Sequence, residues 1–143
     1  MAMTPYDDAN IFAKILRGEI PSTKIYETDA VVAIMDIMPQ SEGHCLVIPK
    51  AASRNLLDAE DGALQTAIVE VARLARAAKA AFGADGVSMM QFNEAAGGQT
   101  VYHLHFHVIP RYEGVGLKGH GTSGMADPAV LAEQAERIRQ HLA

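Results

Sequence analysis

The stretch GGQTVYHLHFHVIPR, residues 97–111, contains a regular alternation of polar and apolar side chains. Its histidines stand at every second position, at His103, His105 and His107. The residues between and after them are apolar, namely Leu104, Phe106 and Val108. Because alternate side chains of a strand share a face, the pattern predicts a strand over residues 100–109, ended by Pro110. The histidines would then line one face, and the apolar side chains would point into the core.

Four more strands are predicted on the N-terminal side of this stretch, over 24–27, 30–36, 44–49 and 87–92. Apolar residues recur at helical spacing over 59–83, where Gly83 can cap the helix end. A short helix begins near Ile11 and is stopped by Gly18, and a last helix is expected from Asp127 to about residue 141. These elements predict an α+β fold, with a five-stranded antiparallel sheet, one long helix over one face and short terminal helices.

The length and composition limit the class of protein. A chain of 143 residues suits one domain, so we treat 1–143 as a single unit. The net charge of −5 argues against a partner of nucleic acid, which is bound through many basic contacts. No apolar run approaches the roughly 20 residues of a membrane span, and no signal peptide is apparent. With a single cysteine, Cys45, the chain is expected to be cytoplasmic and not to contact a membrane.

Three neighbouring imidazoles favour a chemical role for the histidine stretch. Crowding raises the cost of charging each ring, which keeps at least one neutral near pH 7 and able to act as a nucleophile, base or metal ligand. The preceding glycines, Gly97 and Gly98, can bring main-chain N–H groups close to an anion. The combination favours attack on phosphorus or a carbonyl. A solvated strand face and a zinc site built from His-x-His remain as alternatives.

The motif HLHFHVI, residues 103–109, resembles the signature of the histidine triad superfamily. The stretches NIFAKILRGEIPSTKIYE and AIMDIMPQSEGHCLVIPK resemble the Hint-type branch, the nucleoside phosphoramidases. The resemblance covers about residues 10–112, whereas the glycine-rich loop and helix of 113–143 match less clearly. It implies a homodimer whose two sheets join across the subunits.

The resemblance also implies a reaction. In this family the middle histidine, here His105, attacks the α-phosphorus of a nucleoside 5′-phosphate derivative and forms a nucleotidyl-histidine. Water then releases AMP or another nucleoside monophosphate. His107 would contact the phosphate and help to protonate the leaving group, while His103 and His44 would orient the other histidines. On its own, His44 would more often be a structural histidine.

A purine nucleotide site is implied by the same resemblance. Asp36 would bind the ribose, and Ile37 would pack on the base with Ile11 and Phe12. The phosphate cradle would consist of Asn93, Gly98, Gln99 and Thr100. The alternative interpretation makes Asp36 a turn residue and places Ile11 and Phe12 in the core.

Some relatives bind zinc through Cys-x-x-Cys near the N-terminus, but this chain has Asn10 and Ala13 at those positions. We therefore expect no metal and no cofactor. Three other functions remain open: a dinucleoside polyphosphate hydrolase, a purine-nucleotide-binding regulatory module with vestigial activity, and a metal-dependent hydrolase.

Overall fold

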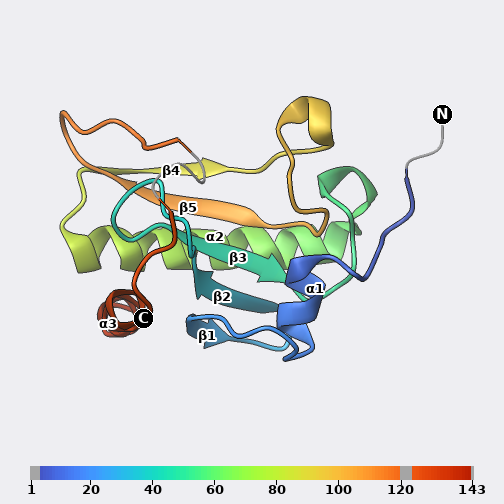
Figure 1. Cartoon of the computed structure of the whole chain (residues 1–143), viewed down its shortest axis with the longest axis horizontal. Helices are drawn as coiled ribbons and strands as arrows, with labels where there is room; N and C mark the ends of the chain where they lie inside the picture. The colour runs from blue at the N-terminus through green and yellow to red at the C-terminus, as the bar shows by residue number, and fades with distance from the viewer. Residues whose placement is uncertain (1–3, 120–123, 143) are drawn as a thin grey trace.

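A five-stranded antiparallel sheet organises the fold, with strand order β1-β2-β3-β5-β4 (Figure 1). The account rests on a computed structural model, which describes residues 4–119 and 124–142. The strands are β1 (Lys24–Glu27), β2 (Val31–Met35), β3 (Cys45–Pro49), β4 (Gly86–Met90) and β5 (Phe106–Arg111). The α-helices are α1 (Ile11–Leu16), α2 (Asp61–Phe82) and α3 (Pro128–Arg139), and two 3₁₀ turns are η1 (Leu56–Asp58) and η2 (Ala95–Gly97). The predicted α+β class and sheet are confirmed.

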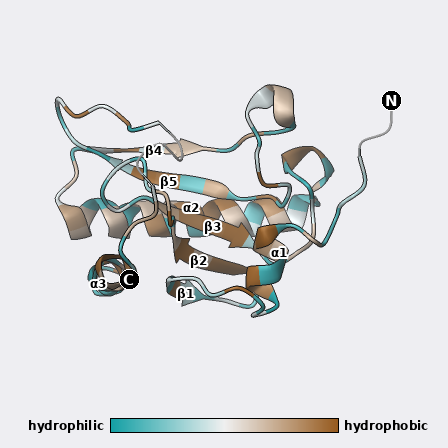
Figure 2. Ribbon diagram, viewed as in Figure 1, coloured by the Kyte–Doolittle hydropathy of each residue, from teal (hydrophilic) through white to brown (hydrophobic). Residues whose placement is uncertain are grey.

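Both faces of the sheet are covered, by different helices. Alternate residues of β2 diverge: Ala33 belongs to the large core under α2, whereas Ile34 belongs to a smaller cluster that packs against α1. The strands β2 and β3 are buried along their whole length and are among the most apolar segments (Figure 2). The helix α3 contacts α2 and β1. The prediction placed only the long helix on the sheet, and the structure shows that α1 covers the opposite face.

Two predicted helix caps are confirmed, and the last helix ends at Arg139, slightly before the predicted residue 141. Gly83 adopts φ 59° as the C-cap of α2, and the Asp127 side chain accepts a hydrogen bond from Ala129 N as the N-cap of α3. Ile68 lies in the predicted apolar stripe but is 46% exposed. In the described part of the chain, no helix combines the length and the apolar character needed to cross a membrane.

The predicted strand over 100–109 is wrong at both ends. The strand β5 begins at Phe106, and residues 101–105 leave the sheet. Extending the β3–β5 register would place Leu104 opposite Pro49, which has no N–H to donate, and Leu104 N instead donates to Ser53 O at 2.9 Å. Pro110 does not end β5, which continues to Arg111. The pairing of β5 with β3 begins at Val108 opposite Cys45, so no residue of β3 lies opposite Pro110. Ser41 Oγ donates to the Pro110 carbonyl. The prediction for the apolar residues holds, since Leu104, Phe106 and Val108 lie in the large core.

Candidate active site

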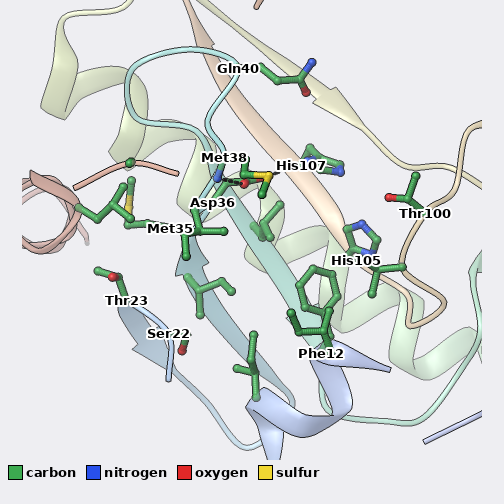
Figure 3. Close-up of a pocket in the computed structure, with 18 of the residues that line it drawn as sticks. Phe12, Ser22, Thr23, Met35, Asp36, Met38, Gln40, Thr100, His105 and His107 are labelled. Carbon is green, nitrogen blue, oxygen red and sulfur yellow. Dashed lines mark hydrogen bonds and ion pairs between the residues drawn. The ribbon is translucent and has the colours of Figure 1, made fainter. Parts of the chain in front are cut away.

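A cavity of about 730 Å³ lies between α1, the start of β5 and the loop after β2 (Figure 3). Most of its wall is apolar, and histidines and an aspartate stand among the few polar groups. Nine of the twelve predicted site residues line it: Ile11, Phe12, Asp36, Ile37, Gly98, Gln99, Thr100, His105 and His107. The other three, His44, Asn93 and His103, do not belong to its lining. All four predicted histidines are nonetheless buried, so the alternative of a solvated histidine face is excluded.

The protonation of His105 follows from its hydrogen bond. Its Nδ1 lies 2.7 Å from the main-chain oxygen of His103. A carbonyl oxygen only accepts, so Nδ1 carries a proton, and in the neutral ring the lone pair is therefore on Nε2. Phe12 packs edge-on against the ring, with 4.7 Å between the ring centroids. The bond and the packing together hold the His105 ring in one orientation in the cavity wall.

A second chain of hydrogen bonds fixes His44 and His107. The main-chain N–H of Gln40 donates to His44 Nδ1 at 3.0 Å, so the His44 proton lies on Nε2. His44 Nε2 is 2.9 Å from His107 Nδ1 and can donate to it. Neutral His107 then carries its own proton on Nε2. The tautomers of the two rings that line the cavity are therefore opposite: His105 presents a lone pair on Nε2, and His107 presents a proton there.

Asp36 lies beside this second chain. Its Oδ1 accepts a hydrogen bond from Met38 N at 2.8 Å, the contact drawn in Figure 3. Its Oδ2 is 3.3 Å from His44 Nε2 and 3.9 Å from His107 Nδ1. Asp36 is thus held by the loop that follows β2 and also lines the cavity. The bond from Met38 N, two residues on, is the turn role that the alternative interpretation gave to Asp36 at the end of β2, and Asp36 lines the cavity as well.

The ligand atoms of Asp36, His44 and His107 lie within 4.8 Å of one another, a spacing that suits a metal ion. Tetrahedral zinc with bonds of about 2.0–2.1 Å separates its ligands by roughly 3.4 Å, close to the distances found here. The tautomer of His44 does not suit the ion, however. Gln40 donates to Nδ1, so Nε2 points an N–H and not a lone pair at the cluster. Metal binding would require His44 to lose the bond from Gln40.

His103 lies behind the cavity and is fully buried. Its Nε2 donates to the carbonyl of Pro49 at 2.7 Å, which leaves Nδ1 as an acceptor for the hydroxyl of Tyr6 at 2.6 Å. Burial lowers the pKa of His103, although the bond to the Pro49 carbonyl acts in the opposite direction. A neutral His103 whose own carbonyl orients His105 is therefore a structural neighbour of the candidate nucleophile.

The loop after β4 uses most of its predicted phosphate-binding groups internally. The Gln99 amide makes four hydrogen bonds, with Asn55 Nδ2, Glu94 N and the carbonyls of Arg54 and Val101. The N–H groups of Gly97, Gly98 and Gln99 donate within the η2 turn. The N–H groups of Gly97 and Gly98, which were predicted to approach an anion, therefore already donate to carbonyl groups of the turn.

Two further residues of the loop have different positions. Asn93 Oδ1 accepts from Leu56 N and lies outside the cavity lining. Thr100 makes no hydrogen bond among the described residues through its hydroxyl or its N–H, and it lines the cavity. Of the predicted cradle, Thr100 is the residue best placed to meet an anion.

Several residues that shape the site were not predicted. Tyr6 contacts His103, Gln40 sets the tautomer of His44, and Arg54 makes a bidentate ion pair with Glu94. Glu94 takes φ 66°, which is rare outside glycine, and this ion pair helps to hold it there. No local pattern identifies these residues, because Tyr6 and Arg54 bond partners that are distant in sequence, and Gln40 bonds His44 through a main-chain N–H that any residue other than proline would supply.

Comparisons with known proteins agree with this geometry. The family described as HIT domain matches residues 17–114. A crystal structure of a HIT-like protein from Bartonella henselae superposes with a TM-score of 0.90 at 55% identity, covering 96% of this chain and all of that one. The adenosine 5′-monophosphoramidase HNT1 of Saccharomyces cerevisiae is 43% identical over 73% of this chain and 64% of its own length. The adenylylsulfatase HINT3 of Arabidopsis thaliana is 38% identical over 72% of this chain and 52% of its length. The chain belongs to the HIT domain family.

Proposed function

We propose that this protein hydrolyses nucleoside 5′-phosphoramidates or related adenylates at the α-phosphorus, through a nucleotidyl intermediate on His105. The observation that carries the proposal is the bond from His105 Nδ1 to the His103 carbonyl, which leaves the Nε2 lone pair as the reactive atom in the cavity wall. The names of two relatives, an adenosine 5′-monophosphoramidase and an adenylylsulfatase, support the same substrate class.

The reaction takes two steps. The Nε2 lone pair of His105 attacks phosphorus and forms a P–N bond, while the bond to the leaving group breaks. His107 supplies a proton from Nε2 to the departing nitrogen or oxygen. Water then attacks the nucleotidyl-histidine and gives its proton back to His107, which releases AMP or another nucleoside monophosphate. The chain from Gln40 through His44 supports this role, because it keeps the His107 proton on Nε2 in the resting enzyme.

The remaining cavity residues suit a nucleoside. Ile11, Phe12 and Ile37 provide an apolar slot for the base, and the slot extends past Met35 to Ser22 and Thr23 (Figure 3). The Asp36 carboxylate can accept hydrogen bonds from the ribose hydroxyls. Thr100 would donate to the phosphoryl oxygens, and the turn of Gly98 and Gln99 holds Thr100 in place.

The charge of the site favours phosphoramidates and adenylates over dinucleoside polyphosphates. Among the described residues that line the cavity there is no Lys or Arg, and the Asp36 carboxylate lies within 4 Å of the two-histidine chain. A polyphosphate leaving group brings several negative charges that nothing in this lining neutralises. A leaving group with little charge avoids that cost. Polyphosphate hydrolysis is therefore the second candidate function.

A homodimer completes the proposal. The strand β4 lies at the edge of the sheet, and Met89 on it is exposed, as are Ile68 and Val69 on α2. These features support a dimer that continues the sheet across β4. Light scattering of the wild type and of Val69→Glu tests it, since the charged variant should be monomeric if α2 is part of the contact.

The test of function is AMP release from adenosine 5′-phosphoramidate with a chelator present. The wild type should turn over, and His105→Ala should not. His141→Ala changes an exposed histidine that follows α3, and as the matched control it should behave as the wild type. AMP binding without turnover would favour the regulatory module. Turnover by His105→Ala would refute His105 as the nucleophile, and turnover lost with the chelator would favour a metal-dependent hydrolase.

A further inference from the structure

The segment before α1 and the first turn of α1 each contact one of the site histidines. Tyr6 donates its hydroxyl proton to His103 Nδ1, and its ring packs edge-on against the His103 ring with 5.6 Å between centroids. Asn10 is the N-cap of α1, accepting from Ala13 N, and its Nδ2 donates to the Tyr6 oxygen at 3.1 Å. Phe12, two residues later, packs on His105. The N-cap of α1 is therefore tied to the histidine stretch through a single tyrosine hydroxyl.

We infer that Tyr6 is a positioning residue for the reaction: its hydroxyl, acting with the Pro49 carbonyl on the other ring nitrogen, holds His103 in the Nε2–H tautomer and in place, and the main-chain carbonyl of His103 orients His105. This inference rests on the proposed function. Two hydrogen bonds hold the His103 ring, one at each nitrogen, and both are short. The main chain of the same residue accepts the His105 Nδ1 proton. The orientation of the nucleophile thus depends on a residue 97 positions away from His103.

The geometry explains why a hydroxyl is needed at this position. Pro49 O only accepts, so it fixes the His103 proton on Nε2 and requires a donor at Nδ1. His103 is 1% exposed, so bulk water does not supply that donor. Tyr6 supplies it, and Asn10 in turn keeps the Tyr6 oxygen from needing another donor. Without the hydroxyl, a buried nitrogen would lose its partner, and the ring could rotate or take up a proton instead.

The variant Tyr6→Phe tests the inference, because it removes the hydroxyl and keeps the ring contact. Tyr112→Phe is the matched control, because its hydroxyl donates to the main-chain oxygen of Glu42 and not to a histidine. We expect kcat for adenosine 5′-phosphoramidate to fall about tenfold in Tyr6→Phe, with KM changed less than about twofold, since a positioning defect acts on the reacting geometry. Tyr112→Phe should match the wild type in both constants.

A spectroscopic readout separates this role from general destabilisation. Imidazole ¹⁵N spectra, assigned with His103→Gln, should show His103 of the wild type as one neutral tautomer with its proton on Nε2. In Tyr6→Phe the His103 nitrogen shifts should move toward a mixture of forms, and those of His105 should change with them. This arm needs no turnover, so it reads the Tyr6–His103 bond even if the wild type proves inactive on the phosphoramidate.

The outcomes are distinct. A shifted His103 spectrum with reduced kcat supports the inference. An unchanged His103 spectrum in Tyr6→Phe overturns it, because the hydroxyl then does not set the tautomer. A shifted spectrum with unchanged kcat also overturns it, because the bond then has no effect on the nucleophile. If the wild type is inactive but Tyr6→Phe changes the His103 spectrum, the proposed function is refuted, whereas the effect of the Tyr6 hydroxyl on His103 is supported.

Discussion

Gly43 offers a sharp test of how the chain reaches His44. It adopts φ +87°, and a Cβ built on it would lie 2.6 Å from two ring carbons of Phe82 and 3.1 Å from Pro110 Cγ. Gly43→Ala should therefore suffer both backbone strain and a clash with the last residue of α2. Gly18, at φ +78° with no atom within 4 Å of such a Cβ, is the matched control for the strain alone.

The two substitutions separate the contributions. Left-handed backbone costs a non-glycine residue about 1 kcal/mol, which both variants share. Overpacking in a filled interior adds about 1–3 kcal/mol, and only Gly43→Ala incurs it. The Phe82 ring is partly buried against the core, and the guanidinium of Arg137 lies 4.7 Å from its centroid, so a shift of the ring would disturb both contacts. Gly43→Ala should thus lose about 2–4 kcal/mol of unfolding free energy, and Gly18→Ala about 1 kcal/mol.

Urea denaturation of the two variants and the wild type measures this difference. A chain of this size should also lose about 2–4 °C of melting temperature for each kcal/mol. Adding Phe82→Leu to Gly43→Ala should recover part of the lost stability, and the double-mutant cycle isolates the clash. If Gly43→Ala and Gly18→Ala are equally stable within about 0.5 kcal/mol, the packing of Phe82 beneath Gly43 is wrong.

Three further predictions concern the site. Thr100→Val should lower kcat about tenfold with little change in melting temperature, because it removes a donor to the phosphoryl oxygens, and an unchanged kcat would exclude Thr100 from the cradle. Burial lowers the pKa of His103, so the unfolded chain binds this proton at a higher pH than the folded chain does. The contribution of His103 to the unfolding free energy should be complete above about pH 6.5, the usual pKa of histidine, and should be lost as the pH falls below it. Thermal melts of His103→Gln should show a weaker pH dependence than those of the wild type. Added zinc should not raise turnover, nor a chelator reduce it, and stimulation by zinc would mean that His44 gives up its bond from Gln40.

The periodicity of the sequence predicted most of the fold, for physical reasons. The strand Lys24–Glu27 and the long helix follow from local patterns that burial then enforces, and Gly83 and Asp127 act as the caps their residue types suggest. The start of β5 could not be predicted in this way. An alternating pattern over 100–109 describes which side chains are buried, but whether the main chain pairs there depends on Pro49 in a distant strand.

The site was predictable as a set of residue types but not as a hydrogen-bond network. The resemblance of HLHFHVI to the histidine triad signature pointed to His105 and His107, which the structure brings to one cavity. Gln99 donates to the carbonyl of Arg54, and Tyr6 donates to His103. Both partners are far away in the sequence, so no spacing in the sequence encodes these contacts. The predicted ribose and phosphate roles of Asp36, Asn93 and Thr100 stay predictions.

The covalent intermediate provides the most direct test of the central claim, that His105 Nε2 is the nucleophile. Wild-type protein mixed with adenosine 5′-phosphoramidate, quenched under alkaline denaturing conditions and digested, should yield an adenylylated peptide, with the modification located on His105 by mass spectrometry. His105→Ala should yield none, and His141→Ala should label as the wild type does. An adenylyl group found on His103 or His107, or turnover without any labelled histidine, would contradict the account.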